Sequence, residues 1–491
     1  MKLIELLNEI KTISVKGNPD IEIQDIMYDS RTPKKESLFV CLKGYTLDGH
    51  DYVNEVYKMG VRSFVVEKDV ALPDDAVTIF VENTRVSLAY LSAAFFGFPS
   101  KKLITVALTG TKGKTSASFM IKSILEKSGK KVGVIGTIGI FYGNTHIETD
   151  NSTPESYEIH KYFAKMLEIG CDTVVIEATS QGFMMHRTNG IIFDIGIFTN
   201  LSRDHIGGNE HPDFEHYVNC KKQLFRQSEF AVFNRDSEYW EIMLEGSNCP
   251  YTTFGMSDGA DYTGSTPQYI TEKNHFFTYF YCKNGLEMHK IEVSIPGQFS
   301  VYNALVAIAC TRQLNSSYED IRSGLRTTVV KGRMEILPDT EDFTVIIDYA
   351  HNELSMQSLY NTINLYSHNK IYTVFGCGGN RSKLRRFAMG EISGQNSDLS
   401  IITSDNPRLE SVIDIIEDII KGIEPTGGEY EIIVDRKSAI FEALEKATKG
   451  DIVLIVGKGH QDYEEIQGEK YPFDERLIVA EYFERKSSNK Q

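Results

Sequence analysis

Eight residues, Thr109 to Ser116 (TGTKGKTS), have the types and spacing that hold the phosphates of a nucleoside triphosphate. An apolar run precedes them and a helical pattern follows, which predicts a glycine-rich turn between a strand and a helix. Gly110 and Gly113 allow backbone N–H groups to surround phosphate oxygens, and Lys114 adds a positive charge. The Thr115 hydroxyl is a candidate ligand of Mg²⁺. The loop therefore predicts binding of a nucleoside triphosphate.

This loop is shorter than the usual phosphate-binding motif. That motif has a glycine five residues before Gly113, where this chain has Leu108. The alternative is a glycine turn that binds nothing, but the strand expected over residues 103–108 and the helix expected over 117–125 argue against it. The candidates for contact with the nucleotide are Gly110, Thr111, Lys112, Gly113, Lys114, Thr115 and Ser116.

The composition is that of a globular protein, with 41% apolar and 24% charged residues and a formal net charge of −16. No apolar stretch approaches the about 20 residues that a membrane span needs, and the N-terminus lacks the pattern of a signal peptide. Seven cysteines at scattered spacings, none in a C-x-x-C pair, predict neither a disulfide framework nor a zinc site. We expect a monomeric cytoplasmic protein with small-molecule substrates, no nucleic-acid partner and no membrane insertion.

Alternating strand and helix patterns predict an α/β fold with three domains. Residues 1–100 are expected to form a smaller α/β domain, and 101–335 a central nucleotide-binding domain with a mostly parallel sheet and crossover helices. Residues 336–491 are expected to form a Rossmann-like α/β domain.

Polar residues or glycines follow six of the expected strands, and this is the edge where open α/β sheets bind ligands. Each of these residues alone could be a helix cap or a turn residue, but together they argue for a site shared between two sheets. They are Glu177, Asn200, Asp348, Gly376, Asp405 and Gly457.

Sequence motifs spread over nearly the whole chain resemble those of the Mur ligases, ATP-dependent enzymes that form amide bonds in cell-wall precursors. The motifs are DSR (29–31), SLFVCLKGYTLDGHDYV (37–53), TGTKGKTS (109–116), NSTPES (151–156), IEATSQG (176–182), TNLSRDH (199–205), EHYVNCK (215–221), GQFSVYNAL (297–305), KGRMEIL (331–337), DYAH (348–351), GCGGNR (376–381), DNPR (405–408) and GKGHQDY (457–463). Within the family, the chain is most similar to the branch that adds the third peptide residue to UDP-N-acetylmuramoyl-L-alanyl-D-glutamate. The resemblance implies peptidoglycan synthesis, and hence a contribution to cell shape and division.

The resemblance also implies a mechanism in which ATP phosphorylates a carboxylate and an amine then attacks the acyl phosphate. Transfer between anions requires positive charge, which Lys114 and Mg²⁺ would supply. The implied metal ligands are Thr115, Glu177, His205 and Lys221, and the implied catalytic residues are Lys114, Glu177, His205 and Lys221. Asn303, Arg333 and Asp348 would also contact ATP.

Lys221 resembles the family lysine that carries a carbamate, N6-carboxylysine, formed from an uncharged amine and carbon dioxide. The carbamate would convert a cation into an anion beside the Mg²⁺. The alternative is an ordinary solvated lysine on a helix next to Lys222.

Two further groups of residues follow from the resemblance. Contacts with the UDP-muramoyl-dipeptide are implied for Ser30, Tyr45, Thr46, Leu47, Ser152, Thr153, Thr179 and Arg187. Contacts with the incoming amino acid are implied for Arg386, Asp405, Asn406, Pro407, Arg408, Gly457 and Gln461.

DNPR resembles the form that adds meso-diaminopimelate, in which the arginine meets the far carboxylate. Arg408 can hold a carboxylate through two parallel N–H bonds and would repel the terminal ammonium of L-lysine. Alternatively, Arg408 caps a helix or pairs with Glu410.

The chain departs from the family pattern at several positions. Gln461 stands where diaminopimelate enzymes usually have a glutamate that meets the distal amino group; glutamine accepts a hydrogen bond but supplies no countercharge. Asn380 replaces the usual aspartate of GCGGDR, and Thr179-Ser180-Gln181-Gly182 replaces Ser-Ser-His-Gly. L-Lysine, or another diamino diacid such as lanthionine, therefore remains an alternative third residue.

Three other readings are compatible with the loop alone. A folylpolyglutamate-synthase-like ligase is disfavoured by the N-terminal segment and by DNPR. A P-loop ATPase that is not a ligase would need neither DNPR nor EHYVNCK. A catalytically inactive binding protein would lack the phosphate and metal ligands that are present here.

Overall fold

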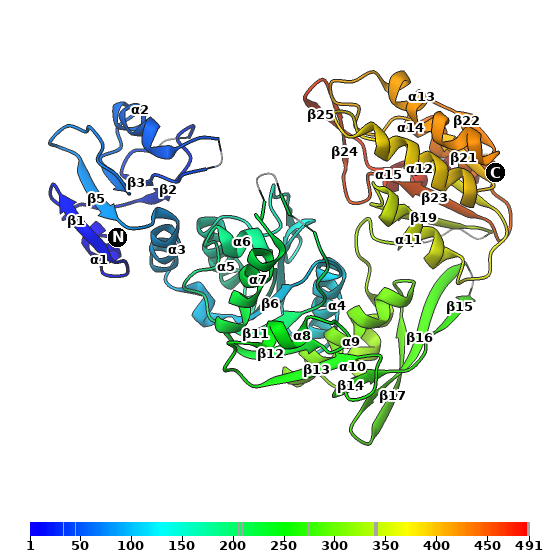
Figure 1. Ribbon diagram of the computed structural model, residues 1–491, viewed down its shortest axis with the longest axis horizontal. Helices are drawn as coiled ribbons and strands as arrows, with labels where there is room; N and C mark the ends of the chain where they lie inside the picture. Colours follow the sequence, from blue (N-terminus) through cyan, green and yellow to red (C-terminus); the bar gives the residue numbers. More distant parts are fainter. Residues whose placement is uncertain are drawn as a thin grey trace. The chain divides into compact units, whose positions relative to one another are not determined.

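The structure is a computed structural model that describes residues 1–32, 34–44, 46–204, 206–207, 210–272, 274–337 and 342–488. Figure 1 traces the chain from its N-terminus in blue to its C-terminus in red. The chain divides into two compact units. The first comprises Met1–Thr263 and Leu305–Ile321, and the second Gly264–Ala304 and Arg322–Gln491. The domain boundaries near residues 100 and 335 stay a prediction.

The N-terminal part of the first unit is a five-stranded sheet in the order β1-β5-β4-β3-β2, parallel except for β1. Its strands are β1 (Thr12–Lys16), β2 (Asp25–Met27), β3 (Ser37–Val40), β4 (Ser63–Val66) and β5 (Val77–Val81), and its helices are α1 (Leu3–Leu7), η1 (Gly49–Tyr52), α2 (Val53–Lys58), α3 (Thr84–Phe95) and η2 (Pro99–Lys102). Helix α3 begins where the Asn83 side chain accepts hydrogen bonds from the first backbone N–H groups, and Leu88 and Leu91 pack into the core.

The remainder of the first unit has a sheet in the order β9-β8-β7-β10-β6-β11-β12-β13-β14. Strands β7 to β14 are parallel apart from the edge strands β8 and β9, which form antiparallel hairpins. The strands are β6 (Ile104–Thr109), β7 (Val132–Gly136), β8 (Gly139–Tyr142), β9 (Thr145–Ile147), β10 (Thr173–Glu177), β11 (Phe193–Phe198), β12 (Ser228–Asn234), β13 (Tyr251–Gly255) and β14 (Tyr262–Gly264). The helices are α4 (Lys114–Lys127), α5 (Ser156–Glu168), α6 (Ser180–Met184), α7 (Phe214–Arg226) and α8 (Trp240–Leu244).

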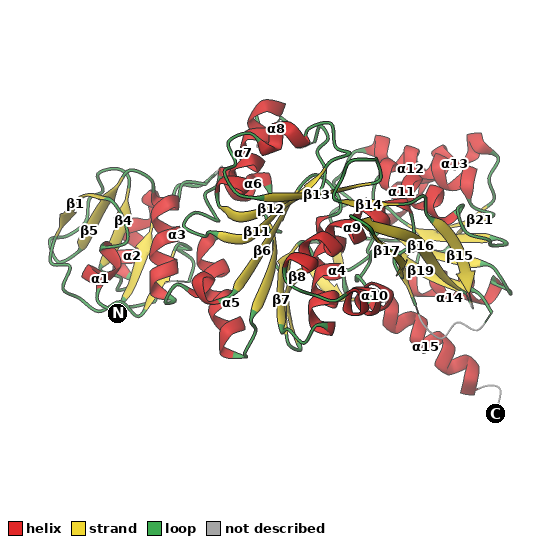
Figure 2. Ribbon diagram, turned by 90° about the horizontal axis from the view of Figure 1, so that it is seen from below, coloured by secondary structure: helices red, strands yellow, loops and turns green. Residues whose placement is uncertain are grey.

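Helices cover this sheet on its two faces (Figure 2). Ala107, Ile135 and Ile176 share a core with residues of α5 and α7, whereas α4 packs against β6, β7 and β10. Because neither face is exposed, the residues of the central strands are buried almost without interruption instead of at alternate positions.

In the second unit the chain first forms three antiparallel strands, β15 (Gln268–Glu272), β16 (His275–Asn284) and β17 (Glu287–Val293). These strands differ from the expectation, which was a mostly parallel sheet with crossover helices as far as residue 335. In β16, buried and exposed residues alternate along the strand, the pattern of a sheet with one covered face. Helices α9 (Gln298–Gln313) and α10 (Tyr318–Thr327) have residues in both units.

The second unit ends in a six-stranded sheet in the order β18-β19-β23-β20-β21-β22, in which only β18 is antiparallel to its neighbour. The strands are β18 (Glu335–Ile336), β19 (Thr344–Asp348), β20 (Ile371–Phe375), β21 (Leu399–Ile402), β22 (Tyr430–Ile432) and β23 (Ile452–Val456), followed by the hairpin of β24 (Tyr463–Ile466) and β25 (Glu469–Pro472). The helices are α11 (Glu353–Ile363), α12 (Lys383–Asn396), α13 (Val412–Ile423), η3 (Glu424–Thr426), α14 (Arg436–Lys446) and α15 (Glu475–Ser488).

Alternate residues of this sheet enter two separate cores. Ile346 and Leu454 face α11, α12 and α13, whereas Val345 and Val453 face α14 and α15. This is a doubly wound sheet, and the expected α/β fold class is confirmed. No helix among the described residues is both long and apolar enough to span a membrane.

Candidate functional site

The glycine-rich loop joins β6 directly to α4. Gly113 is the N-cap of α4 with a φ of 87°, a left-handed conformation, and the helix begins at Lys114, three residues before the expected start. A Cβ added to Gly110 would lie 2.0 Å from the Thr199 hydroxyl oxygen. The loop therefore requires glycine at both positions, and its backbone N–H groups lie at a helix N-terminus.

Residues after β11 hold this loop in place. The backbone carbonyl of Asn200 accepts a hydrogen bond from the Thr111 N–H at 2.9 Å, and its side-chain amide is bonded to the Lys112 N–H and carbonyl, each at 2.9 Å. The Thr199 hydroxyl also donates to the Lys112 carbonyl at 2.8 Å. Asn200 was one of the strand-end residues expected at the ligand edge, whereas Thr199 was not singled out, although it lies in the TNLSRDH motif.

Two lysines from different helices meet at one carbonyl oxygen. The Gly110 carbonyl accepts hydrogen bonds from Lys114 Nζ at 2.8 Å and from Lys221 Nζ at 2.9 Å. Lys221, on α7, is only 2% exposed, so it is not the solvated lysine of the alternative interpretation. Burial, and then the positive charge of Lys114, lower the pKa of Lys221 well below its ordinary value. The geometry thus favours an uncharged amine at this position.

Glu177 lies buried at the end of β10. Its carboxylate accepts hydrogen bonds from the Thr137 N–H at 3.1 Å and the Thr137 hydroxyl at 2.9 Å. The Thr137 hydroxyl is also 2.8 Å from that of Ser152. Thr137 follows the end of β7 directly, and its position after a strand was the only sequence feature that could have identified it.

A cavity of about 330 Å³ opens between these elements. Predicted phosphate-binding and muramoyl-peptide-binding residues line it together; the lining comprises Lys114, Thr137, Asp150, Asn151, Ser152, Thr153, Thr179, Ser180, Gln181 and Arg187. The Thr153 and Thr179 hydroxyl oxygens are 2.9 Å apart, and Arg187 donates to the Thr153 carbonyl at 2.8 Å. Arg187 also forms an ion pair with Glu155 at 2.9 Å.

The other residues expected near the UDP group lie in the N-terminal sheet region. Ser30 is half-buried beside Asp29, whose carboxylate binds Arg31, and Thr46 and Leu47 are exposed. Two expected site residues, Tyr45 and His205, lie outside the described residues.

In the second unit, Asp348 ends β19. Its carboxylate oxygens accept hydrogen bonds from the backbone N–H groups of Met334 at 2.7 Å and Ala350 at 2.8 Å. Burial raises the pKa of Asp348, and the nearby Arg333 opposes that shift. Arg333 lies over the Tyr349 ring, with its Cζ 5.0 Å from the ring centroid. Asn303 lies half-buried on α9.

Arg408 follows β21 in a left-handed backbone conformation with a φ of 53°. Its Nε donates to Glu465 at 3.0 Å and its Nη1 to the Gly379 carbonyl at 2.7 Å. Among the described residues, the hydrogen bonds of this side chain use Nε and Nη1 and not Nη2, and the side chain is 25% exposed. Arg408 therefore pairs with Glu465, not with Glu410 as the alternative interpretation supposed.

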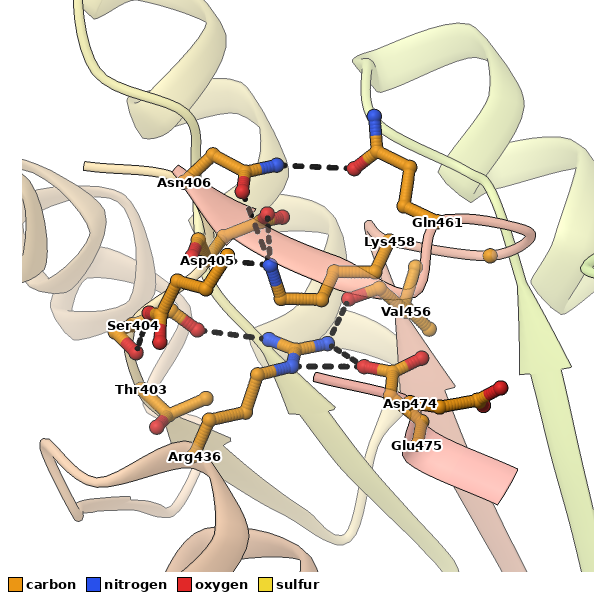
Figure 3. Close-up of polar contacts among 12 residues, drawn as sticks. Thr403, Ser404, Asp405, Asn406, Arg436, Val456, Lys458, Gln461, Asp474 and Glu475 are labelled. Atoms are coloured by element: carbon orange, nitrogen blue, oxygen red, sulfur yellow. Dashed lines mark hydrogen bonds and ion pairs between the residues drawn. The ribbon is translucent and has the colours of Figure 1, made fainter. Parts of the chain in front are cut away.

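A buried lysine holds the loop that precedes Arg408 (Figure 3). Lys458 Nζ donates to the Asp405 carbonyl at 3.2 Å and to the Asn406 side-chain oxygen at 3.1 Å. The Asn406 amide nitrogen in turn donates to Gln461 Oε1 at 2.9 Å. A Cβ added to Gly457 would lie 2.4 Å from the Asp405 carboxylate, so glycine permits this close approach.

Beneath this loop lies an ion pair with no exposed surface, formed by Arg436 and Glu475 (Figure 3). Arg436 also donates to the carbonyls of Ser404 and Val456, each at 2.9 Å. Neither Lys458 nor this pair was predicted, although Lys458 lies within the GKGHQDY motif.

Arg386, on α12, is buried and bound to two carboxylates. Its Nη1 donates to Asp418 at 3.1 Å, and its Nη2 donates to Glu410 at 2.8 Å. In this arrangement Arg386 supports the loop that carries Arg408 and Glu410. Its contact with the incoming amino acid stays a prediction.

Three family models match successive parts of the chain. Residues 22–95 match "Mur ligase family, catalytic domain", residues 108–311 match "Mur ligase middle domain", and residues 332–459 match "Mur ligase, glutamate ligase domain".

Individual relatives extend this similarity over the full length. The chain is 37% identical to the UDP-N-acetylmuramoyl-L-alanyl-D-glutamate--2,6-diaminopimelate ligase of Clostridium perfringens (strain 13 / Type A), over 99% of this chain and 100% of that protein. It is 40% identical to the ligase of the same name from Alkaliphilus oremlandii (strain OhILAs), over 98% of each. A solved structure of a ligase with this name has a TM-score of 0.72 at 24% identity and covers 99% of each chain. Identity of this extent over nearly the whole chain, together with the three family models, shows that the chain belongs to the Mur ligase family.

Proposed function

We propose that this chain is the ATP-dependent ligase that joins meso-diaminopimelate to UDP-N-acetylmuramoyl-L-alanyl-D-glutamate and releases ADP and phosphate. The observation that carries the proposal is the identity of 37% and 40%, over nearly the whole chain, with ligases named for these two substrates. The reaction supplies peptidoglycan precursors and thereby cell-wall growth and division. We place it in the cytoplasm, catalysed by a single chain.

In the first step, an oxygen of the glutamate carboxylate attacks the γ-phosphorus of ATP and ADP leaves. In the second, the amine of the incoming amino acid attacks the acyl carbon, loses a proton, and phosphate leaves. The loop residues 110–116 would bind the phosphates through backbone N–H groups, with Lys114 compensating their charge. We propose that Asn303, Arg333 and Asp348 contact the same nucleotide.

The residues beside the loop fit Mg²⁺. This ion prefers hard oxygen ligands, and the Thr115 hydroxyl and the buried Glu177 carboxylate are of that kind. Each Glu177 oxygen already accepts one hydrogen bond from Thr137, and a carboxylate has lone pairs left for a metal. When bound, Mg²⁺ would neutralise charge on the transferred phosphoryl group.

Lys221 would act as a carbamate in this mechanism. Carbon dioxide reacts with an uncharged amine, and burial together with Lys114 favours that form at Lys221. The carbamate would place a negative charge next to Lys114, which attracts the Lys114 ammonium. We propose His205 as a further metal ligand.

Residues on the cavity wall would hold the muramoyl-dipeptide. Ser152, Thr153, Thr179 and Arg187 line the cavity with Lys114, so a carboxylate there would lie near the transferred phosphate. Ser30, Tyr45, Thr46 and Leu47 would contact the UDP group.

Arg408 would select the amino acid. Its Nη2 can donate to a carboxylate while Nε and Nη1 remain bound to Glu465 and Gly379. The rest of the binding site for the amino acid would consist of Asp405, Asn406, Pro407 and Gly457. Arg386 would be a second contact for a carboxylate. Gln461 brings no negative charge toward a distal amine, and its oxygen already accepts from Asn406. This feature favours a second candidate substrate, another diamino diacid such as lanthionine.

The test is incubation of the protein with ATP, Mg²⁺ and UDP-N-acetylmuramoyl-L-alanyl-D-glutamate against a panel of amino acids, with ADP release and product mass as readouts. We expect ADP release that requires both substrates and is fastest with meso-diaminopimelate. ADP release that ignores the amino acid would indicate an ATPase instead. Activity only with folate and glutamate would indicate a folylpolyglutamate-synthase-like enzyme.

A further inference from the structure

Three side chains that could bind a metal ion meet at α7, two of them on the helix and one just before it. None of the three is assigned to the ligase reaction. They are His211, His216 and Cys220, and one ligand atom from each lies within 4.8 Å of the others. His211 Nδ1 is 2.9 Å from His216 Nδ1, which is 3.7 Å from Cys220 Sγ. His211 and Cys220 are buried and His216 is partly exposed, so the cluster can be reached from solvent at one side.

The local structure fixes the positions of these ligands. His216 and Cys220 are four residues apart on α7 and therefore lie on the same face of the helix. The Asp213 side chain accepts a hydrogen bond from the His216 N–H at 2.7 Å, which begins the helix immediately before them. His211 precedes the helix, and its ring packs edge-on against Tyr217 with centroids 5.2 Å apart.

We propose that His211, His216 and Cys220 bind one zinc ion, with a water molecule as the fourth ligand. Zn–N bonds of about 2.0–2.1 Å and Zn–S bonds of about 2.3 Å in a tetrahedral site separate two nitrogens by about 3.3 Å and a nitrogen from a sulfur by about 3.6 Å. The observed separations of 2.9 Å and 3.7 Å are close to these values, so small ring movements suffice. The Zn–S bond forms as the thiol proton leaves to solvent, and the metal keeps its oxidation state.

The ligand set selects zinc over the Mg²⁺ of the ligase reaction. Two imidazoles and a thiolate suit zinc and cobalt, whereas Mg²⁺ prefers oxygen ligands. Cysteine spacing gave no hint of this site, because two of its three ligands are histidines and no second cysteine is involved.

The position of the site indicates a structural effect. Tyr217 and Lys221, which follow two of the ligands on α7, reach the glycine-rich loop: the Tyr217 hydroxyl is 3.1 Å from that of Thr111, and Lys221 donates to the Gly110 carbonyl. A zinc ion would link His211, which lies before α7, to His216 and Cys220 on that helix. This link would restrict the motion of the helix that carries Lys221.

The experiment is a titration of tag-free, chelator-treated full-length protein with Co²⁺, followed by displacement with Zn²⁺. We expect one equivalent of Co²⁺ to bind with a thiolate-to-cobalt charge-transfer band, which Zn²⁺ abolishes. Because loss of an outer-shell partner alone weakens metal binding by about 10- to 100-fold, Cys220→Ser should weaken binding at least about 100-fold. His216→Ala, at a partly exposed position, should do the same, and Cys249→Ala, the half-buried cysteine outside the cluster, should bind as the wild type does.

Thermal unfolding provides a second readout that does not depend on ligase activity. Added Zn²⁺ should raise the melting temperature of the wild type and of Cys249→Ala, and leave Cys220→Ser and His216→Ala unchanged. The proposal is overturned if no charge-transfer band forms in the wild type, or if Cys220→Ser and His216→Ala bind as tightly as the wild type. In that case the His211–His216 contact is only a hydrogen bond.

Discussion

At the scale of single residues, the Gly110 carbonyl oxygen brings two proposed catalytic lysines together in the first unit, because Lys114 and Lys221 both donate a hydrogen bond to it. Two protonated amines so close together repel each other, and burial adds to the cost of charging them. Lys221 yields its proton more readily because it is the more deeply buried of the two. One lysine is thus suited to remain a cation for phosphate, and the other to react with carbon dioxide.

We expect Lys114→Ala to abolish ligation while the fold is retained. Loss of a cation that compensates phosphate charge in the transition state should slow turnover on the order of a thousandfold. The readout is ADP release at saturating substrates, with far-UV circular dichroism as the check on folding. Lys127→Ala, an exposed position on the same helix, is the control and should be unaffected. Near-normal turnover of Lys114→Ala would contradict the mechanism.

We expect Lys221→Ala to be nearly inactive and to recover part of its activity when formate or acetate is added. A small carboxylate can occupy the space of the carbamate and restore the negative charge. Lys222→Ala should have a mild effect, because the amine of Lys222 forms an ion pair with the exposed Glu245, which follows α8, and not a bond to the glycine-rich loop. If Lys222 proves essential and Lys221 dispensable, the assignment of the carbamate is wrong.

The preference for meso-diaminopimelate over L-lysine should depend on Arg408. With lysine the guanidinium loses a carboxylate partner and meets a second cation, which costs a few kcal/mol and about 100-fold in kcat/KM. Arg408→Ala should remove most of this preference. Gln461→Glu should sharpen discrimination between the meso, LL and DD isomers, since it adds a negative charge near the distal amine. Equal use of lysine by the wild type would move the chain to the lysine-adding branch.

At the scale of elements, buried charged side chains fix the carboxyl ends of the strands in the second unit. Lys458 holds Asp405 and Asn406, and the Arg436–Glu475 pair holds the carbonyls of Ser404 and Val456. These contacts cross from β21 to β23 and to the start of α14 and α15. They fix the loop that presents Arg408.

Arg436→Met should lower the free energy of unfolding by about 3–5 kcal/mol, because it leaves the Glu475 carboxylate buried without its partner. Combining it with Glu475→Met removes both charges and should restore part of this loss. Urea unfolding measures the change in stability. The KM for the amino acid should rise in Arg436→Met and in the double variant, because both lose the hydrogen bonds from Arg436 to the Ser404 and Val456 carbonyls. Lys437 follows Arg436 on α14 and forms a partly exposed ion pair with Glu481 on α15, and Lys437→Ala, which breaks this pair, should cost at most about 1 kcal/mol. A double variant as unstable as the sum of the two single ones would contradict this account.

The positions of the strands that end in polar residues could be predicted from the sequence, because an apolar run followed by glycine or an acidic residue is typical of a parallel strand that ends at a ligand site. Asp348 ends β19 and Gly457 follows β23, so both lie at strand ends as expected; the structure adds that these two strands are neighbours. Lys458 and Arg436 could not be recognised in this way, because the residue type alone does not show whether a lysine or an arginine is buried or solvated. The antiparallel strands β15 to β17 were missed because the alternation of strands and helices was extended across them.

At the scale of the whole molecule, stability should depend on pH through a buried histidine to which the proposed reaction assigns no role. His160, on α5, is buried, and neither of its ring nitrogens has a hydrogen-bond partner among the described residues. Burial lowers the pKa of His160 from 6.5 to about 4. The folded first unit therefore holds this imidazole neutral under conditions in which the unfolded chain would protonate it.

The free energy of unfolding should fall as the pH drops from 6.5 toward 4. Above pH 6.5 both states are neutral at His160, and below it only the unfolded chain gains a proton, which favours unfolding. The gap between a pKa of 6.5 and one of about 4 corresponds to about 3 kcal/mol. His160→Phe should reduce the slope of this part of the profile, measured by urea unfolding at a series of pH values, whereas the slope contributed by His460, whose pKa is also lowered to about 4, should remain. A variant with the slope of the wild type would show that other groups cause the acid sensitivity.

The backbone at Arg408 has a consequence for how this protein can change over evolutionary time. A φ of 53° favours glycine, and a residue with a Cβ there is strained by on the order of 1 kcal/mol. Folding alone would therefore reward the loss of this arginine, and selection for the substrate must continually oppose that drift. A lineage whose cell wall no longer requires a diacid at this step would be expected to lose Arg408 early, and to gain stability when glycine takes its place.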